Sequence, residues 1–243
     1  MFDDVKIPKL IERSPIKEAN IEIRLSAKIP LGTEYGILYP VLKDFFENLP
    51  ESLPSFPEQN RIKEFDPNLR YLPTHRIQKG NVGLAFGNRS LIFRHIAPYT
   101  SWKEWSDFFY PVIDKVFKNT QYSEVSVERL GIRYIDFMEN SDFSDTTLSF
   151  SICDSLILRN RSQFRTVFNE NSDSVILSVS NPTEPVKGLA VDLDFVRSFD
   201  LISSDNFLKV CRDSLDEAHI KIKKYFFGLL KPEIIESLNP SWN

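Results

Sequence analysis

Apolar and polar residues alternate most regularly along residues 123–138, which predicts a long strand. One face of this segment carries Val125, Val127, Arg129, Gly131, Arg133, Ile135 and Phe137. The other face carries Leu130, Ile132, Tyr134 and Met138, together with Glu124, Glu128 and Asp136. Because apolar residues occur on both faces, we expect a central strand of the sheet that is covered on both sides.

Further strands follow from the same period of two. In the first half of the chain they are expected at 19–29 and, as two or three strands, within 74–96, where the sequence Gly-Asn-Arg-Ser at 87–90 predicts a turn. In the second half they are expected at 146–158, 163–170, 174–180 and 188–199. Short strands joined in sequence order favour antiparallel pairing.

Three segments have apolar residues at helical spacing: 35–49, 102–117 and 206–230. The second is the best specified, because Ser101 is placed to cap it and Glu104 completes a capping box. Pro111 lies inside this pattern and is expected to kink or split the helix. Residues 50–73 are rich in proline and predict a surface excursion with one short strand near 61–65.

These elements predict an α+β fold in which three main helices pack on one face of an antiparallel sheet, or of two continuous sheets. The hydrophobic pattern resumes directly after each loop, so we expect residues 1–243 to form a single domain. Residues 1–140 and 141–243 have a similar order of predicted strands and helices, which suggests two related halves. The two halves show no repeat at the level of individual residues.

Composition narrows the functional classes. Lysine and arginine total 30 against 34 acidic residues, and a net charge of −4 argues against a protein built for broad nucleic-acid binding. Cys153 and Cys211 stand in unrelated contexts, which predicts reduced thiols. No pair among the three histidines has metal-ligand spacing, and no cofactor motif occurs, so we expect neither a metal nor a cofactor. The N-terminus lacks an apolar targeting segment and no long apolar run occurs, so a cytoplasmic protein without a membrane span is expected.

Three stretches carry a family resemblance: GNRSLIF with YTSWKEWSDF, then VERLGIRYIDF, then SLDEAHIKIKKYFFGLL. In order along the chain they resemble an uncharacterised bacterial family of similar length that is distributed sporadically. Its pattern is matched by Trp102, Trp105, Arg129, Gly131, Arg133, Tyr134, His219 and Phe226, whereas Asp136 stands where asparagine is more usual. The resemblance implies no activity or cofactor. A patchy distribution implies genes carried in mobile or defence-type cassettes.

The first candidate site is on the predicted central strand. Arg129 and Arg133 share one face, roughly 13 Å apart along the backbone, and Gly131 leaves open space between them. Two guanidinium groups in this arrangement, with Tyr134 beside them, are suited to a phosphate or carboxylate. The alternative is that each arginine pairs with a carboxylate of a neighbouring element, as buried charges normally do.

Other candidates have an ordinary structural alternative. His219 with Asp216 at i−3 forms an acid–histidine pair or a solvated helix face. Trp102 and Trp105 line a groove or anchor a core. A basic turn with one aromatic ring is a candidate nucleic-acid site, in which the ring would stack on a base. Its residues are Arg159, Arg161, Phe164 and Arg165. The alternative is that this turn is solvated surface.

No catalytic motif is present, and the sequence therefore favours a non-enzymatic binding or regulatory module. The expected ligand site is lined by Arg129, Arg133 and Tyr134. The expected partner is a protein, a second copy of the chain, or a small anionic molecule. The alternative is a protein that binds or processes nucleic acid in a defence-type system.

Overall fold

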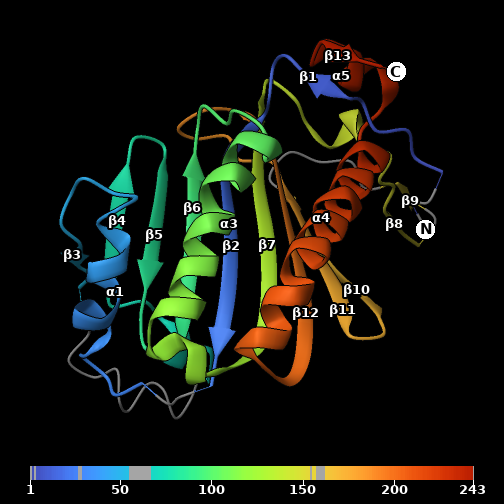
Figure 1. The fold of residues 1–243 in the computed structure, drawn as a ribbon. Helices are drawn as coiled ribbons and strands as arrows, with labels where there is room; N and C mark the ends of the chain where they lie inside the picture. The colour runs from blue at the N-terminus through green and yellow to red at the C-terminus, as the bar shows by residue number, and fades with distance from the viewer. Residues whose placement is uncertain are drawn as a thin grey trace. The chain divides into compact units, whose positions relative to one another are not determined.

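The computed structural model describes residues 2, 4–26, 29–54, 67–153, 155–156 and 162–242. In this part of the chain an antiparallel sheet of nine strands is the main element, and the predicted α+β class is confirmed (Figure 1). From one edge to the other the strands are β10 (Gln163–Glu170), β11 (Asp173–Ser180), β12 (Gly188–Ser203), β7 (Ser126–Glu139), β2 (Ile16–Leu25), β6 (Ser90–Ile96), β5 (Val82–Phe86), β4 (His75–Lys79) and β3 (Glu51–Ser52).

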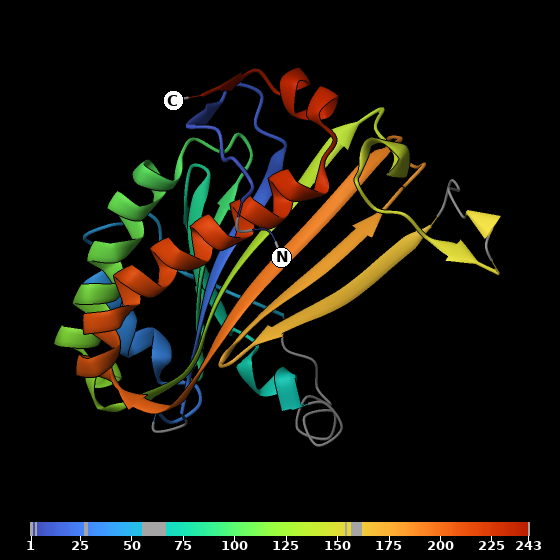
Figure 2. The same cartoon turned by 90° about the vertical axis from the view of Figure 1, so that its right-hand side faces the viewer.

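The structure has three main helices, as predicted, and they pack against strands of the sheet (Figure 2). They are α1 (Glu34–Leu42), α3 (Trp102–Asn119) and α4 (Ser204–Leu229). The shorter helical elements are α5 (Pro232–Ser237) and the 3-10 helices η1 (Pro67–Tyr71), η2 (Gln121–Glu124) and η3 (Phe143–Asp145). Two small sheets pair β1 (Leu10–Ile11) with β13 (Pro240–Ser241) and β8 (Ser151–Ile152) with β9 (Ser155–Leu156). None of the described helices combines the length and the apolar character that a membrane crossing requires.

The chain divides into two compact units, and each is assembled from separate segments. Unit 1 consists of Met1–Ala19, Arg133–Phe195 and Asp216–Asn243, and unit 2 consists of Asn20–Ile132 and Val196–Leu215. Both units therefore contain residues from each of the sequence halves 1–140 and 141–243. The strands β2, β7 and β12 and the helix α4 contribute residues to both units.

The core of unit 2 forms between its strands and the helix α3. The helix begins at a cap, because the Ser101 hydroxyl accepts a hydrogen bond from the Glu104 amide at 3.1 Å. Its buried stripe includes Phe109, Val112, Val116 and Phe117, and the strands contribute Ile21, Ile23, Leu25, Phe93, Val127, Leu130 and Ile132. The helix runs through Pro111 without being split, because burial of this long stripe outweighs the lost hydrogen bond.

The core of unit 1 forms in the same way beneath the C-terminal part of α4. Its strands contribute Tyr134, Met138, Val175, Leu177, Val179, Leu189, Val191, Leu193 and Phe195, and the helix contributes Ala218, Ile222, Tyr225, Phe226 and Leu229. The alternation along β12 places Ala190, Asp192 and Asp194 on the opposite face, where they are half-buried. The last helix was predicted at 206–230 and its observed bounds agree within two residues.

Two predicted elements differ from the structure. The first helix was expected to reach residue 49 but ends at Leu42. Phe46 is still buried, and its ring meets the Phe108 ring edge-on at a centroid distance of 5.5 Å. The apolar residues after Leu42 therefore reflect tertiary packing and not a longer helix. The segment 146–158 was expected to be one strand, and its described part contains only the two-residue strands β8 and β9. The strand expected near 61–65 lies outside the described residues.

Two glycines offer a test of close packing in the sheet. A Cβ atom on Gly188 would lie 2.6 Å from the Met138 carbonyl oxygen and 2.5 Å from the Phe137 ring, whereas one on Gly36 would meet nothing within 4 Å. Gly188→Ala should lower the free energy of unfolding by about 1–3 kcal/mol, as overpacking does. Gly36→Ala, the matched control inside α1, should raise it by about 0.5–1 kcal/mol. Urea denaturation of both variants measures the difference, and equal stabilities would contradict the strand packing.

Candidate functional site

The arginine-bearing strand β7 occupies a central place in the sheet, between β12 and β2, as predicted. Its alternation shifts by one residue near the start, because Glu128 and Arg129 are two consecutive half-buried residues between the buried Val127 and Leu130. Val127 is therefore buried while Arg129 is half-buried, although strict alternation would give the two residues the same environment.

Arg129, in unit 2, belongs to a network of charged side chains. Its guanidinium lies 3.7 Å from the Glu22 carboxylate, which also accepts a hydrogen bond from Arg24 at 2.9 Å. The Arg24 guanidinium stacks over the Tyr71 ring at 4.5 Å, and the Tyr71 hydroxyl donates to Glu128. Burial and the hydrogen bond to Glu128 raise the pKa of Tyr71. This network attaches η1 to the sheet, and it gives Arg129 a structural partner.

Arg133, in unit 1, pairs with Asp192 on β12. Its Nε and one terminal nitrogen donate to the two carboxylate oxygens at 2.7 and 2.6 Å. This bidentate hydrogen bonding raises the pKa of Arg133 although partial burial opposes it. Arg129 and Arg133 thus fall in different units, and each has a carboxylate partner within its own unit.

Tyr134 points into unit 1 and meets His219 on α4. The Tyr134 hydroxyl and His219 Nδ1 are 2.9 Å apart, and their ring centroids are 5.8 Å apart. Burial, with the Lys223 charge nearby, lowers the pKa of His219 to about 3, so the imidazole is neutral near pH 7. Burial also lowers the pKa of Lys223. The structure brings together two residues that the sequence treated as separate candidates.

Asp136 follows Tyr134 on the same buried face of β7, and only 3% of its surface is exposed. Burial raises the pKa of Asp136 to about 8, and the negative charge of Asp192 adds to the effect. A carboxyl group in this position keeps its proton near neutral pH. The sequence showed Asp136 as a polar residue on an apolar strand, but its burial depends on α4.

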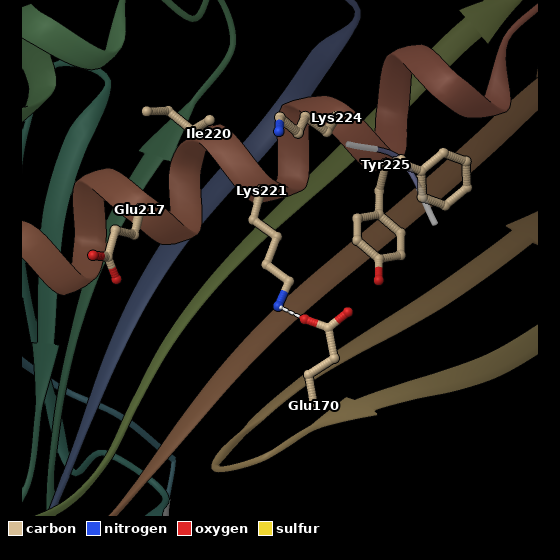
Figure 3. A pocket seen from close by; sticks show the side chains of 7 residues that line it. Glu170, Glu217, Ile220, Lys221, Lys224 and Tyr225 are labelled. Carbon is tan, nitrogen blue, oxygen red and sulfur yellow. Dashed lines mark hydrogen bonds and ion pairs between the residues drawn. The ribbon is translucent and has the colours of Figure 1, made fainter. Parts of the chain in front are cut away.

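A pocket of about 330 Å³ opens in unit 1 between α4 and the β10–β11 hairpin (Figure 3). Its described lining consists of Phe2, Glu170, Glu217, Ile220, Lys221, Lys224 and Tyr225. Lys221 reaches across to Glu170 on the hairpin at 2.5 Å, and the Phe2 and Tyr225 rings lie 4.7 Å apart. The pocket therefore presents two lysines and two glutamates beside aromatic and aliphatic surface.

The sequence analysis did not predict this pocket. Ile220 lies on the polar side of α4 and is 51% exposed, but a single exposed aliphatic residue is common and does not by itself indicate a pocket. Glu170 is 51 residues away from Lys221 in sequence, and only the hairpin brings it to the helix.

Two residues of the predicted nucleic-acid site, Phe164 and Arg165, belong to the described part of the chain. Phe164 and Arg165 are neighbours on β10, so they project to opposite faces. Phe164 pairs with the buried Val179 and lies 4.8 Å from the Phe150 ring, on the side that faces the core. Arg159 and Arg161 lie outside the described residues.

The tryptophan pair belongs to an aromatic cluster in unit 2. Trp102 and Trp105 meet edge to face at 6.0 Å, and Trp105 is buried against His95 and Phe109. Burial lowers the pKa of His95, whose Nδ1 lies 2.9 Å from the Ile96 carbonyl oxygen. This arrangement fits the core alternative that the sequence left open. Among the described residues, no three histidine, cysteine or acidic side chains gather as metal ligands.

Comparisons with known proteins leave the chain without an assigned relative. Neither a scan against protein-family models nor a search of curated proteins finds a match. The resemblance to a sporadically distributed bacterial family therefore stays a prediction, and the argument for function depends on the geometry of the sites.

Asp136 provides a pH-dependent test of this geometry. Its folded-state pKa of about 8 lies above the unfolded value, so the folded protein binds more protons between about pH 4 and pH 8, and its stability falls as pH rises through that window. Asp136→Asn imitates the protonated carboxyl and removes this effect. The stability of Asp136→Asn relative to the original protein should rise by roughly 3 kcal/mol between about pH 5 and pH 8.

Chemical denaturation at several pH values measures this difference. The exposed residue Asp107, which pairs with Lys103 on α3, supplies the control Asp107→Asn, whose effect should change little over the same range. A pH-independent difference for Asp136→Asn would show that the carboxyl is ionised in the folded protein.

Proposed function

We propose that this chain is a non-enzymatic binding module whose ligand is a small anionic molecule with an aromatic or aliphatic part. The observation that carries the proposal is the pocket beside α4, where Lys221 and Lys224 stand next to Tyr225, Phe2 and Ile220. Ligand sites commonly combine apolar walls with a few polar groups that fix orientation. The pocket offers charged groups and apolar surface to a ligand, and this combination supports a role in binding.

The helix geometry places these groups side by side. Lys221 and Lys224 are three residues apart on α4, and Tyr225 follows directly, so the ammonium groups and the ring border one hollow. Tyr225 is held between Phe2 and Phe168, at centroid distances of 4.7 and 5.2 Å. A ring held in this way loses little conformational freedom when a ligand packs on it.

Glu170 and Glu217 are the two carboxylates of the pocket lining, and Glu170 pairs with Lys221. The Glu170 carboxylate lies 2.5 Å from Lys221 Nζ; the Glu170 side chain is 57% exposed and the Lys221 side chain 25%. An ion pair with one solvent-exposed partner contributes little free energy, typically about 1 kcal/mol or less. A ligand carboxylate, sulfonate or phosphate can therefore take the place of Glu170 at Lys221 at small cost, and its apolar part would rest on Tyr225 and Ile220.

Anilinonaphthalene sulfonate, an aromatic anion whose fluorescence rises in apolar surroundings, provides a direct test. Lys221→Met should weaken its binding roughly tenfold, because a charge-assisted hydrogen bond is lost. Glu170→Gln should strengthen binding, because Lys221 is released from its partner. Neutral phenylnaphthylamine should bind all three proteins alike, since it has no sulfonate. Fluorescence titration measures each affinity.

The control is Lys209→Met, which removes an exposed lysine from the same helix outside the pocket lining. It should leave the affinity for the sulfonate unchanged. Equal effects of Lys209→Met and Lys221→Met would mean that the anion responds to overall charge, and the pocket would then not be the binding site.

The anion site at Arg129 and Arg133 and the nucleic-acid alternative both stay predictions. Each arginine already has a carboxylate partner, and Phe164 and Arg165 point to opposite faces, so the pocket beside α4 is the better supported site. The association with mobile or defence-type cassettes also stays a prediction.

A further inference from the structure

Strand β10 ends the nine-stranded sheet, and within the described part of the chain only β11 pairs with it. The strand is eight residues long and keeps an unbroken register with β11 from Gln163 to Glu170. An edge of this length presents a row of backbone donors and acceptors that can accept another strand. Its sequence has no proline and one charged residue, Arg165, before the terminal glutamate, so few of the features that normally protect an edge are present.

The sequence of β10 is nearly symmetric about Thr166. Going outward from that residue, Phe164 corresponds to Phe168 and Gln163 to Asn169, while the inner pair, Arg165 and Val167, differs in chemistry. The two aromatic positions are identical and the two outer positions both carry amides. A strand with this symmetry can pair with a second copy of itself in antiparallel orientation and place like residues opposite each other.

The hairpin determines which backbone groups point outward. Glu170 pairs with Asp173 across a two-residue connection, so these two residues share the turn hydrogen bond. Hydrogen-bonded residues alternate along an antiparallel strand, and the even-numbered residues of β10 therefore bond to β11. The amide and carbonyl groups of the odd-numbered residues point away from β11, toward the free edge.

We propose that β10 is a dimerisation edge, at which two copies of the chain pair their β10 strands antiparallel about a two-fold axis at Thr166. In this register Arg165 faces Val167 of the second copy and Gln163 faces Asn169, and the outward groups of these odd-numbered residues bond to each other. Thr166 then faces Thr166 in a non-hydrogen-bonded pair, where side chains approach most closely.

The side chains favour this register over its neighbour. Phe164 and Phe168 are half-buried on the side that faces the core, where they contact Phe150 and Tyr225. Pairing about Thr166 sets Phe164 against Phe168 of the second copy and covers both rings. A shift of the axis to Val167 would set Phe164 against Glu170 instead, which places a charge beside an apolar ring. On the opposite face, Val167 is 48% exposed and would be covered by the partner strand.

Cysteine cross-linking tests both the contact and its register. In a Cys153→Ser background, which removes the exposed native thiol, Thr166→Cys should form an intermolecular disulfide under mild oxidation. The reason is that a non-hydrogen-bonded antiparallel pair brings the two Cα atoms to about 4.5 Å. Val167→Cys is the matched control, since its two copies would stand roughly 8 Å apart by strand geometry and beyond disulfide reach.

Non-reducing electrophoresis separates the outcomes. A dimer from Thr166→Cys but not from Val167→Cys supports the proposal. Faster cross-linking of Val167→Cys would overturn the register, and no cross-link from either variant would overturn the interface.

Sedimentation velocity over a range of protein concentrations gives an independent measurement without a cysteine. The protein should show a monomer–dimer equilibrium. Val167→Pro removes an outward N–H and should weaken dimerisation at least roughly tenfold, while proline is tolerated at such an edge position. Val167→Thr keeps the N–H and the branched side chain and should dimerise as before. A protein that stays monomeric at every concentration overturns the proposal, whatever the pocket beside α4 binds.

Discussion

In each unit helices cover one face of the strands, and the behaviour of the polar side chains on those strands depends on this one-sided burial. Neighbouring residues of a strand face opposite sides, so each polar side chain either enters the core beneath a helix or remains near water. On β7 the residues that enter the core of unit 1 include Tyr134, which meets His219, and Asp136, whose pKa burial raises to about 8. Arg133 points the other way and keeps its charge by pairing with Asp192.

The same constraint divides the surface of α4 in unit 1 into two flanks of different chemistry. On one flank, burial lowers the pKa of His219 and Lys223, and the neutral imidazole contacts the Tyr134 hydroxyl. On the other flank, Lys221 and Lys224 border a pocket that is open to solvent. A lysine that packs toward the core is pushed toward the neutral form, whereas the lysines beside the hairpin line the pocket, where an anion could contact them.

The β10–β11 hairpin connects the two proposals without making either depend on the other. Its tip supplies Glu170 to the pocket, and Phe168 of the same strand supports Tyr225 from below the helix. Its outer edge carries the nearly symmetric sequence about Thr166.

Local patterns in the sequence determined the main elements of the fold. Alternation identified β7 and β2, and the Ser101 cap with its apolar stripe identified α3, because strands and helices with one buried face need these periods. Alternation also places Phe164 and Arg165 on opposite faces, so the separation of these two candidates was already present in the sequence. Only the tertiary structure decided that Glu128 and Arg129 are both half-buried.

Tertiary structure likewise decided which charged side chains meet. Tyr134 and His219 are 85 residues apart, Arg133 and Asp192 are 59 apart, and Lys221 and Glu170 are 51 apart. Periodicity indicates which face of a strand or helix a side chain occupies, but it does not indicate which other element packs against that face. That choice depends on strand order and on where each helix packs, because the free energy of burial comes from the whole set of apolar contacts and not from any one segment.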